Sequence, residues 1–245
     1  MRRRTGTAGL ILAAAALVGC GDQPSSDTSG TTRALLDQPR SADVSTVING
    51  LPVSDAEPAL SIDLLGVNVG SPDAPVKVIE FVDYGCGYCR KFQLETFAAL
   101  RDEFIETDIV EWKFMAFVTG MFGNSLVVTE AAECALSESV GLFGPFSDRL
   151  WAQQADWKGS SDPDALVRTW IAELGGDAAA FDTCMRDDTR MERVTSATAL
   201  AAQLGVRATP TFWIVGAGPV QGALPLEVFR EVFTQAHQQV TQGAG

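Results

Sequence analysis

The sequence predicts an α/β fold in which a strand–helix–strand unit is followed by a helical insertion and then by a strand–strand–helix unit. Three observations lead to this prediction. The apolar run Val76–Val82 is followed by a helical pattern and then by a run rich in β-branched and aromatic residues. Residues 123–204 are dense in Ala, Leu, Glu and Gln, and a second apolar run, Phe212–Val215, lies far downstream.

The strand–helix–strand unit begins the folded region. Ser61–Val69 alternates loosely and predicts a first strand. Val76–Val82 is apolar on both faces apart from two charged residues, which is typical of a central strand covered on both sides. Residues 86–106 have apolar side chains near helical spacing, and Ile109–Val118 predicts the next strand. We expect the two later strands to be parallel and joined by a right-handed crossover.

The middle of the chain predicts a helical insertion at about residues 123–204. Turn residues interrupt its pattern often enough for four or five helices. The expected breaks are Gly144-Pro145, Asp162-Pro163 and Gly175-Gly176, and the expected caps are Asn124, Asp162 and Asp177.

The strand–strand–helix unit completes the fold. Phe212–Val215 predicts a strand, Gly216-Ala217-Gly218 a hairpin turn, and Val220–Ala223 the partner strand. Pro225 suits the first position of the last helix, because its missing N–H would be unpaired there. The folded domain is therefore expected over residues 59–240.

The first 58 residues predict a leader and a tether. Residues 1–19 have a basic start, a short apolar run and a small-residue ending, which form a signal-peptide layout. The apolar run is shorter than the roughly 20 residues that span a bilayer. Leu17–Cys20 resembles the lipobox of bacterial lipoproteins, which implies lipidation of Cys20; an ordinary cleaved signal is the alternative. Residues 20–58 are polar and predict a flexible tether.

Charge and export limit the partners. The formal net charge is −13, and residues 1–19 carry three arginines and no acid, so the mature chain is more acidic still. Such a surface repels a phosphate backbone, so we expect no nucleic-acid partner. We expect an extracytoplasmic protein of the bacterial cell envelope, attached to the membrane through lipid, in a compartment where disulfides persist.

Cys86-Gly87-Tyr88-Cys89 opens the first predicted helix and indicates thiol–disulfide exchange. At a helix N-terminus, Cys86 faces unpaired backbone N–H groups that favour its thiolate, so it is the predicted nucleophile. Cys89 lies one turn further and suits the resolving role. Half of a zinc site or a cuprous-ion site is the alternative. The chain has no second CxxC, and its single histidine, His237, lies in the last predicted helix, so we expect no metal or cofactor.

Three segments carry a resemblance to a known family: residues 70–76, residues 80–89, and residues 205–212, which contain Thr209-Pro210-Thr211. With the order of elements, they resemble the DsbA-like thiol–disulfide oxidoreductases of the thioredoxin superfamily, from about residue 66 to 235. The resemblance implies a thioredoxin fold with a helical insertion. It also implies an enzyme that acts on exported cysteine-containing proteins and exchanges electrons with a membrane or soluble redox partner.

The same resemblance implies two supporting residues beside the cysteines. Pro210 would follow a cis peptide bond and pack against the pair, although composition alone favours a trans proline. Thr209 would lie beside Cys86, where its hydroxyl could hydrogen-bond to the thiolate.

Glu80 lies in the otherwise apolar central strand, six residues before Cys86. A carboxylate there is costly unless it is paired or has a function. The resemblance implies a buried acid that moves protons near Cys89. A solvent-facing glutamate, or a salt bridge to Lys77 or Lys113, is the alternative.

Cys134 and Cys184 lie in the predicted insertion, and we expect a structural disulfide between them. A loop of that size gives about 4 kcal/mol of stabilisation on the chain-entropy model. A second redox pair and two free buried thiols are the alternatives.

The direction of exchange depends on the residues between and around the two cysteines. Gly87-Tyr88 differs from the Pro- or His-containing dipeptides of strong oxidants. The resembled isomerases share Gly-Tyr and the threonine before the proline, but they have an N-terminal dimerisation domain, and residues 21–65 are too short and polar to form one. We therefore expect a monomeric oxidoreductase that oxidises mildly. An isomerase or reductase, a metal-binding module and a non-catalytic interaction protein are the alternatives.

Overall fold

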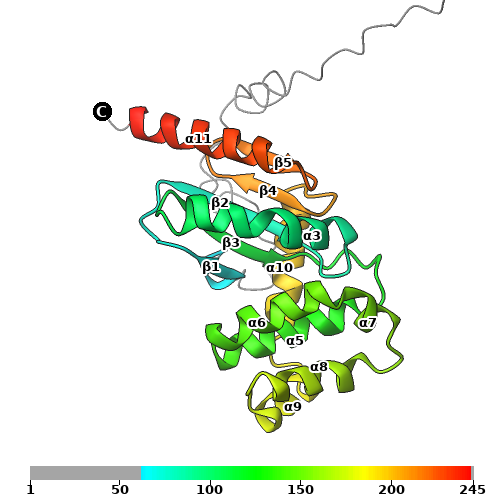
Figure 1. Ribbon diagram of the computed structural model, residues 1–245. Coiled ribbons are helices and arrows are strands. Elements are labelled where there is room, and N and C mark those ends of the chain that lie inside the picture. Colours follow the sequence, from blue (N-terminus) through cyan, green and yellow to red (C-terminus); the bar gives the residue numbers. More distant parts are fainter. Residues whose placement is uncertain (1–61, 244–245) are drawn as a thin grey trace, which may run out of the picture.

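The computed structural model describes residues 62–243 (Figure 1). The predicted signal peptide, the lipidation residue Cys20 and the predicted tether lie outside these residues. Over the described part of the chain, no helix combines the length and the apolar character needed to cross a membrane.

A five-stranded sheet forms the centre of the molecule, in the order β1-β3-β2-β4-β5 (Figure 1). β2 pairs with β3 in parallel and with β4 antiparallel, and β1 and β5 are the antiparallel edges. β2 is the middle strand, and six of its seven residues are buried, as its apolar run predicts. The strands are β1 (Val67–Val69), β2 (Val76–Val82), β3 (Val110–Ala116), β4 (Thr211–Ile214) and β5 (Gly218–Gln221).

The first strand is shorter than the sequence predicts. Ile62–Leu64 forms a turn of 3₁₀ helix, and the extended backbone begins only at Val67. The cause is Gly66, whose φ of +65° bends the chain before the strand. A Cβ atom at Gly66 would lie 2.3 Å from the carbonyl oxygen of Phe114, so a side chain does not fit there.

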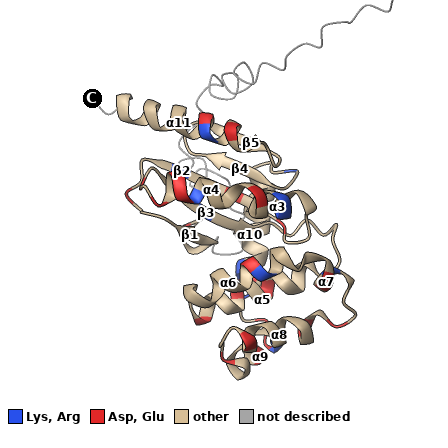
Figure 2. Ribbon diagram, in the orientation of Figure 1, with Lys and Arg blue, Asp and Glu red and all other residues tan. Residues whose placement is uncertain are grey.

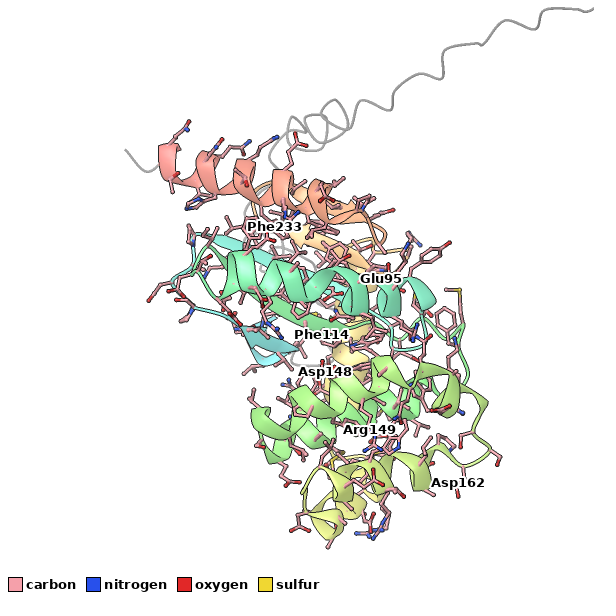
Figure 3. The ribbon with its side chains drawn as sticks, viewed as in Figure 1. Glu95, Phe114, Asp148, Arg149, Asp162 and Phe233 are labelled. Atoms are coloured by element: carbon pink, nitrogen blue, oxygen red, sulfur yellow. A yellow bond between two sulfur atoms is a disulfide. The ribbon has the colours of Figure 1, made fainter. Side chains whose placement is uncertain are left out.

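One face of the sheet is covered by the helical segment after the cysteines and by the C-terminal helix. That segment contains α3 (Gly87–Phe92) and α4 (Ala98–Leu100), each followed by a π-helical turn. Aromatic rings fill the layer between these helices, the sheet and α11 (Leu226–Gly243). Phe92 lies 4.6 Å from Phe212 and 5.2 Å from Phe229 between ring centroids. Phe233 of α11 packs into this core (Figure 3).

The opposite face of the sheet is covered by α10 (Met191–Gln203). Small and aliphatic residues of α10, among them Ala197 and Leu200, pack against Ile79, Phe81 and Met115. Because successive strand residues point to opposite faces, Glu80 points to the other side, toward α3.

The remaining insertion helices pack beside the sheet (Figure 1). Phe114 of β3 lies at this junction, within 6.1 Å of Phe143 and 6.3 Å of Trp151 between ring centroids (Figure 3). The helices are α5 (Ser125–Glu138), α6 (Val140–Ala152), α7 (Gln154–Gly159), α8 (Pro163–Glu173) and α9 (Ala178–Arg186). This is the α/β fold with a helical insertion that the sequence predicts.

The predicted helix break at Gly144-Pro145 is wrong, because α6 continues through Pro145. An interior proline costs a helix about 3 kcal/mol. Burial of Phe143, Phe146 and Leu150 on the same helix offsets that cost. Tertiary packing therefore overrides the local signal.

Two of the three predicted caps act as caps. The side chains of Asp162 and Asp177 accept hydrogen bonds from backbone N–H groups at the starts of α8 and α9. Asn124 precedes α5, but its side chain instead donates to the carbonyl oxygens of Trp157 and Ser160. Asn124 therefore ties α5 to the end of α7 rather than capping its own helix.

Candidate active site

The CxxC pair lies where β2 ends and α3 begins. Cys86 is the N-cap residue of α3, in an extended conformation, and Cys89 lies one turn into the helix. Both are free thiols. Cys86 is 5% exposed and Cys89 is completely buried, so Cys86 is the more accessible sulfur.

The surroundings of Cys86 favour its thiolate and lower its pKa to about 5. The largest cause is a hydrogen bond from the Cys89 thiol. The Thr209 side chain and the backbone N–H groups of Cys89 and Tyr88 act in the same direction, while partial burial opposes them. Cys86 is therefore ionised at neutral pH, as a nucleophile at a helix N-terminus should be.

Cys89 has the opposite character. Burial raises the pKa of its thiol above the usual range, and the hydrogen bond to Cys86 and the charge on that sulfur raise it further. Cys89 therefore stays protonated and can serve as a donor to the Cys86 thiolate.

α3 is basic although the chain is strongly acidic. Its last turn carries Arg90 and Lys91 (Figure 2), and its first turn has no acidic residue. Arg90 Nε donates to the carbonyl oxygen of Trp151 at 2.9 Å, which joins α3 to the insertion. No carboxylate in the first turn therefore opposes the positive end of the helix dipole.

The loop before β4 meets the CxxC pair. The Thr209–Pro210 peptide bond is cis, and Pro210 is buried. Cys86 Sγ lies 3.3 Å from the backbone carbonyl oxygen of Thr209, to which it donates when the thiol is protonated. Thr209 thus lies beside Cys86, as the resemblance implied: its side chain hydrogen-bonds to the sulfur and its carbonyl oxygen makes a further short contact. These residues are brought to Cys86 from more than 120 positions away along the chain.

Glu80 is completely buried on β2. Gln93 Nε2 donates to its two carboxyl oxygens at 3.0 and 2.9 Å, and Trp112 Nε1 donates at 3.1 Å. Burial raises the pKa of Glu80 to about 8, and the hydrogen bonds from Gln93 and Trp112 only partly offset this. At neutral pH this carboxyl holds a proton that it can exchange.

Neither lysine of the alternative interpretation reaches Glu80. Lys77 pairs with Glu111 at 2.7 Å, and Lys113 donates to the carbonyl oxygen of Leu65 at 3.0 Å. The solvent-facing and salt-bridged alternatives for Glu80 are therefore excluded.

Sequence reasoning missed Asp83, a buried acid three residues before Cys86. Its carboxylate accepts from the Gly85 N–H at 2.8 Å, from the Thr119 N–H and hydroxyl at 2.9 and 2.8 Å, and from the Ser125 hydroxyl. These bonds tie the active-site loop to the segment between β3 and α5. In the sequence, the one feature that could have indicated a role for Asp83 is its position directly after the apolar run Val76–Val82.

Cys134 of α5 and Cys184 of α9 form a disulfide across 50 positions. The bond connects the first and last of the helices that pack beside the sheet. Within residues 62–243, no group of three or more His, Cys, Asp or Glu side chains is placed to hold a metal ion.

The chain is similar in sequence to known redox proteins. A family model described as thioredoxin matches residues 65–231. Disulfide bond formation protein D of Bacillus subtilis is 26% identical over 177 residues, which cover 68% of this chain and 71% of that protein. Probable disulfide bond formation protein D of Bacillus cereus is 24% identical over 153 residues, covering 61% of this chain and 69% of that protein.

Two solved structures have the same fold. Wolbachia pipientis alpha-DsbA1 superposes with a TM-score of 0.65 at 21% identity, over 74% of this chain and 98% of that one. Oxidised BdbD from Bacillus subtilis superposes with a TM-score of 0.63 at 22% identity, over 70% of this chain and 92% of that one.

Proposed function

Since this chain belongs to the thioredoxin family and is a thiol–disulfide oxidoreductase, we propose that it oxidises the cysteines of exported proteins through Cys86 and Cys89. One observation carries the proposal: neighbouring thiols differ in acidity, with the pKa of Cys86 lowered to about 5 and that of Cys89 raised. An ionised thiolate beside a protonated and more deeply buried thiol is the arrangement that disulfide exchange requires.

The proposed cycle starts from the Cys86–Cys89 disulfide. A client thiolate attacks the Cys86 sulfur, a mixed disulfide forms, and Cys89 leaves and takes up a proton. A second client thiolate then attacks the client sulfur of the mixed disulfide, so the client disulfide forms and Cys86 leaves as a thiolate. Two electrons have passed to the enzyme. A membrane or soluble redox partner must accept them to restore the disulfide.

Glu80 is proposed as the group that exchanges a proton with Cys89. It is buried on the strand that leads to the CxxC pair, and its pKa of about 8 keeps a proton available at neutral pH. Since Cys89 is also buried, solvent has poor access to the sulfur that must gain or lose a proton.

The low pKa of Cys86 supports the oxidising direction. Stabilising the thiolate stabilises the dithiol form, which makes the disulfide form a better oxidant. The Gly87-Tyr88 dipeptide adds no imidazole to that stabilisation, so we propose a milder oxidant than the His-containing type.

The test combines exchange activity with the redox potential. We expect Cys86→Ser to abolish oxidation of a reduced model client, and equilibrium with glutathione to give a potential between about −120 and −270 mV, the strong-oxidant and reductant extremes. A potential at either extreme contradicts mild oxidation. Stoichiometric cuprous or zinc binding at the pair with weak exchange would favour a metal-binding module instead.

We also propose that the protein is a monomer held at the outer side of a bacterial membrane by lipid on Cys20. The anchor rests on the signal-peptide layout of residues 1–19 and the lipobox-like Leu17–Cys20. The monomeric state rests on residues 21–65, which are too short and polar to form the dimerisation domain of the resembled isomerases. Cys20→Ala should move the protein from the membrane fraction to the soluble extracytoplasmic fraction and end labelling by a radioactive fatty acid. Unchanged fractionation and no fatty-acid label on the wild type would contradict the anchor.

A further inference from the structure

The active-site loop is held by a helix that no sequence motif singles out. α7 belongs to the insertion and lies on the same side of the molecule as the start of α3 (Figure 1). Its first residue, Gln154, is buried, and Gln154 Nε2 donates to the carbonyl oxygens of Tyr84 at 2.6 Å and Cys86 at 3.0 Å. One turn later, Lys158 Nζ donates to the carbonyl oxygen of Gly85 at 2.6 Å. Three consecutive loop carbonyls therefore accept hydrogen bonds from α7.

An aromatic ring completes this contact. Phe122 lies so close to Gly85 that a Cβ atom there would come within 2.3 Å of the Phe122 Cβ. Lys158 Nζ lies 4.8 Å from the centroid of the Phe122 ring, in a cation–π contact. The Lys158 ammonium is thus held between a ring and a carbonyl, one residue from Cys86.

We propose that Gln154 and Lys158 are positioning residues that set the reactivity of Cys86, an inference that rests on the proposed function. Their hydrogen bonds hold the carbonyl groups of residues 84–86 toward α7. The backbone N–H groups at the start of α3 are then kept facing the Cys86 sulfur, where they stabilise the thiolate. Lys158 adds a positive charge beside the loop, which acts in the same direction.

A purely structural role predicts something different. Buried carbonyl groups need donors, so Gln154 and Lys158 could serve stability alone. In that case their loss lowers the free energy of unfolding and leaves the chemistry of Cys86 unchanged. Reactivity and stability must therefore be measured on the same variants.

The experiment uses the full chain with four substitutions. Gln154→Met and Lys158→Met remove the donors and keep most of the side-chain length, while Lys158→Arg keeps the positive charge. Gln153→Met is the matched control, because Gln153 Oε1 accepts from Arg149 Nε, on α6. The rate of Cys86 alkylation by iodoacetamide as a function of pH gives its pKa, and equilibration with glutathione gives the redox equilibrium constant.

We expect both methionine variants to raise the pKa of Cys86, so that its thiolate fraction below pH 5 falls about three- to tenfold. The glutathione equilibrium should shift by a similar factor toward a weaker oxidant. For Lys158→Arg, the thiolate fraction and the glutathione equilibrium constant should stay within about twofold of the wild-type values. Gln153→Met should change neither quantity.

The inference would be overturned if the methionine variants lost thermal stability but kept the wild-type pKa of Cys86 and the wild-type glutathione equilibrium constant. Lys158 is exposed, so Lys158→Met should fold and allow the pKa of Cys86 to be measured even if Gln154→Met does not fold. A wild-type protein that does not exchange disulfides at all would instead contradict the proposed function, so the two failures are distinguishable.

Discussion

At the scale of single residues, burial and hydrogen bonding compete at Cys86 and Glu80 with opposite results. Cys86 is partly buried, but a thiol and two backbone N–H groups donate to its sulfur, so its pKa falls to about 5. Glu80 receives hydrogen bonds from Gln93 and Trp112, yet it is completely buried and its pKa rises to about 8. Neutral donors therefore stabilise a charge well only where desolvation is incomplete.

These two shifts give opposite dependences of stability on pH. Between about pH 4.5 and 8, native Glu80 keeps a proton that the unfolded chain has lost, so Glu80 lowers stability as pH rises. Between about pH 5 and 9, native Cys86 has lost a proton that the unfolded chain keeps, so Cys86 raises stability as pH rises. The two contributions cancel in part in the dithiol form.

A Cys86→Ser background removes the opposing contribution of Cys86 and leaves that of Glu80. In that background, we expect the free energy of unfolding to fall from pH 5 to 8 by up to about 1.4 kcal/mol per pH unit. Adding Glu80→Gln should make the slope shallower, because the amide does not titrate; Glu130, whose pKa burial raises to about 7, accounts for a remaining slope below that pH. Urea denaturation at several pH values measures this.

The control is Glu95→Gln, at an exposed carboxylate of the helical segment that follows the CxxC pair (Figure 3). It should leave the slope unchanged. A Glu80→Gln variant with the slope of its background would show that Glu80 ionises normally.

At the scale of elements, the site depends on the loop between β2 and α3. Asp83 connects this loop to Thr119 and Ser125, while Gln154 and Lys158 connect it to α7. The loop residues 83–86 are all buried, so donors and acceptors from other segments must satisfy its backbone. The conformation of the CxxC start is therefore set by the insertion as well as by α3.

Gly85→Ala tests this packing. The added Cβ would meet Phe122, so we expect a loss of about 1–3 kcal/mol in the free energy of unfolding. Gly87→Ala is the control, because a Cβ atom at Gly87 meets nothing within 4 Å. Chemical denaturation of both variants gives the comparison, and equal stabilities would contradict the close contact of Phe122 with the loop.

At the scale of the whole molecule, α5 links the disulfide to the active site. Its first residue, Ser125, donates to Asp83, and Cys134 on the same helix is bonded to Cys184 of α9. The Cys134–Cys184 disulfide therefore also stabilises α5, which is bonded to the active-site loop through Ser125 and Asp83.

Replacing both Cys134 and Cys184 with serine should lower the free energy of unfolding by about 4 kcal/mol, because the unfolded chain regains the freedom of a 50-residue loop. Denaturation under non-reducing conditions measures the loss. As a check on the bond itself, a Cys86→Ser/Cys89→Ser variant, denatured without reductant, should show no free thiol at Cys134 or Cys184. Two reactive thiols there would contradict the disulfide.

The sequence by itself determined the order of the elements and the CxxC pair, and it predicted the pairing of Cys134 with Cys184 that the structure confirms. These follow from local periodicity, from the short spacing of Cys86 and Cys89, and from the few cysteines available. The proline in α6 shows where such local signals fail, because packing of its neighbours outweighs the intrinsic cost.

Only the tertiary structure decided which groups surround the reacting sulfur. Glu80 meets Trp112 from 32 positions away, and the loop meets Gln154 from about 70 positions away. Such contacts arise when distant segments pack together, and no periodicity in the chain encodes them. The sequence therefore specifies which thiols react, whereas the packing of distant segments brings Thr209 to the Cys86 sulfur.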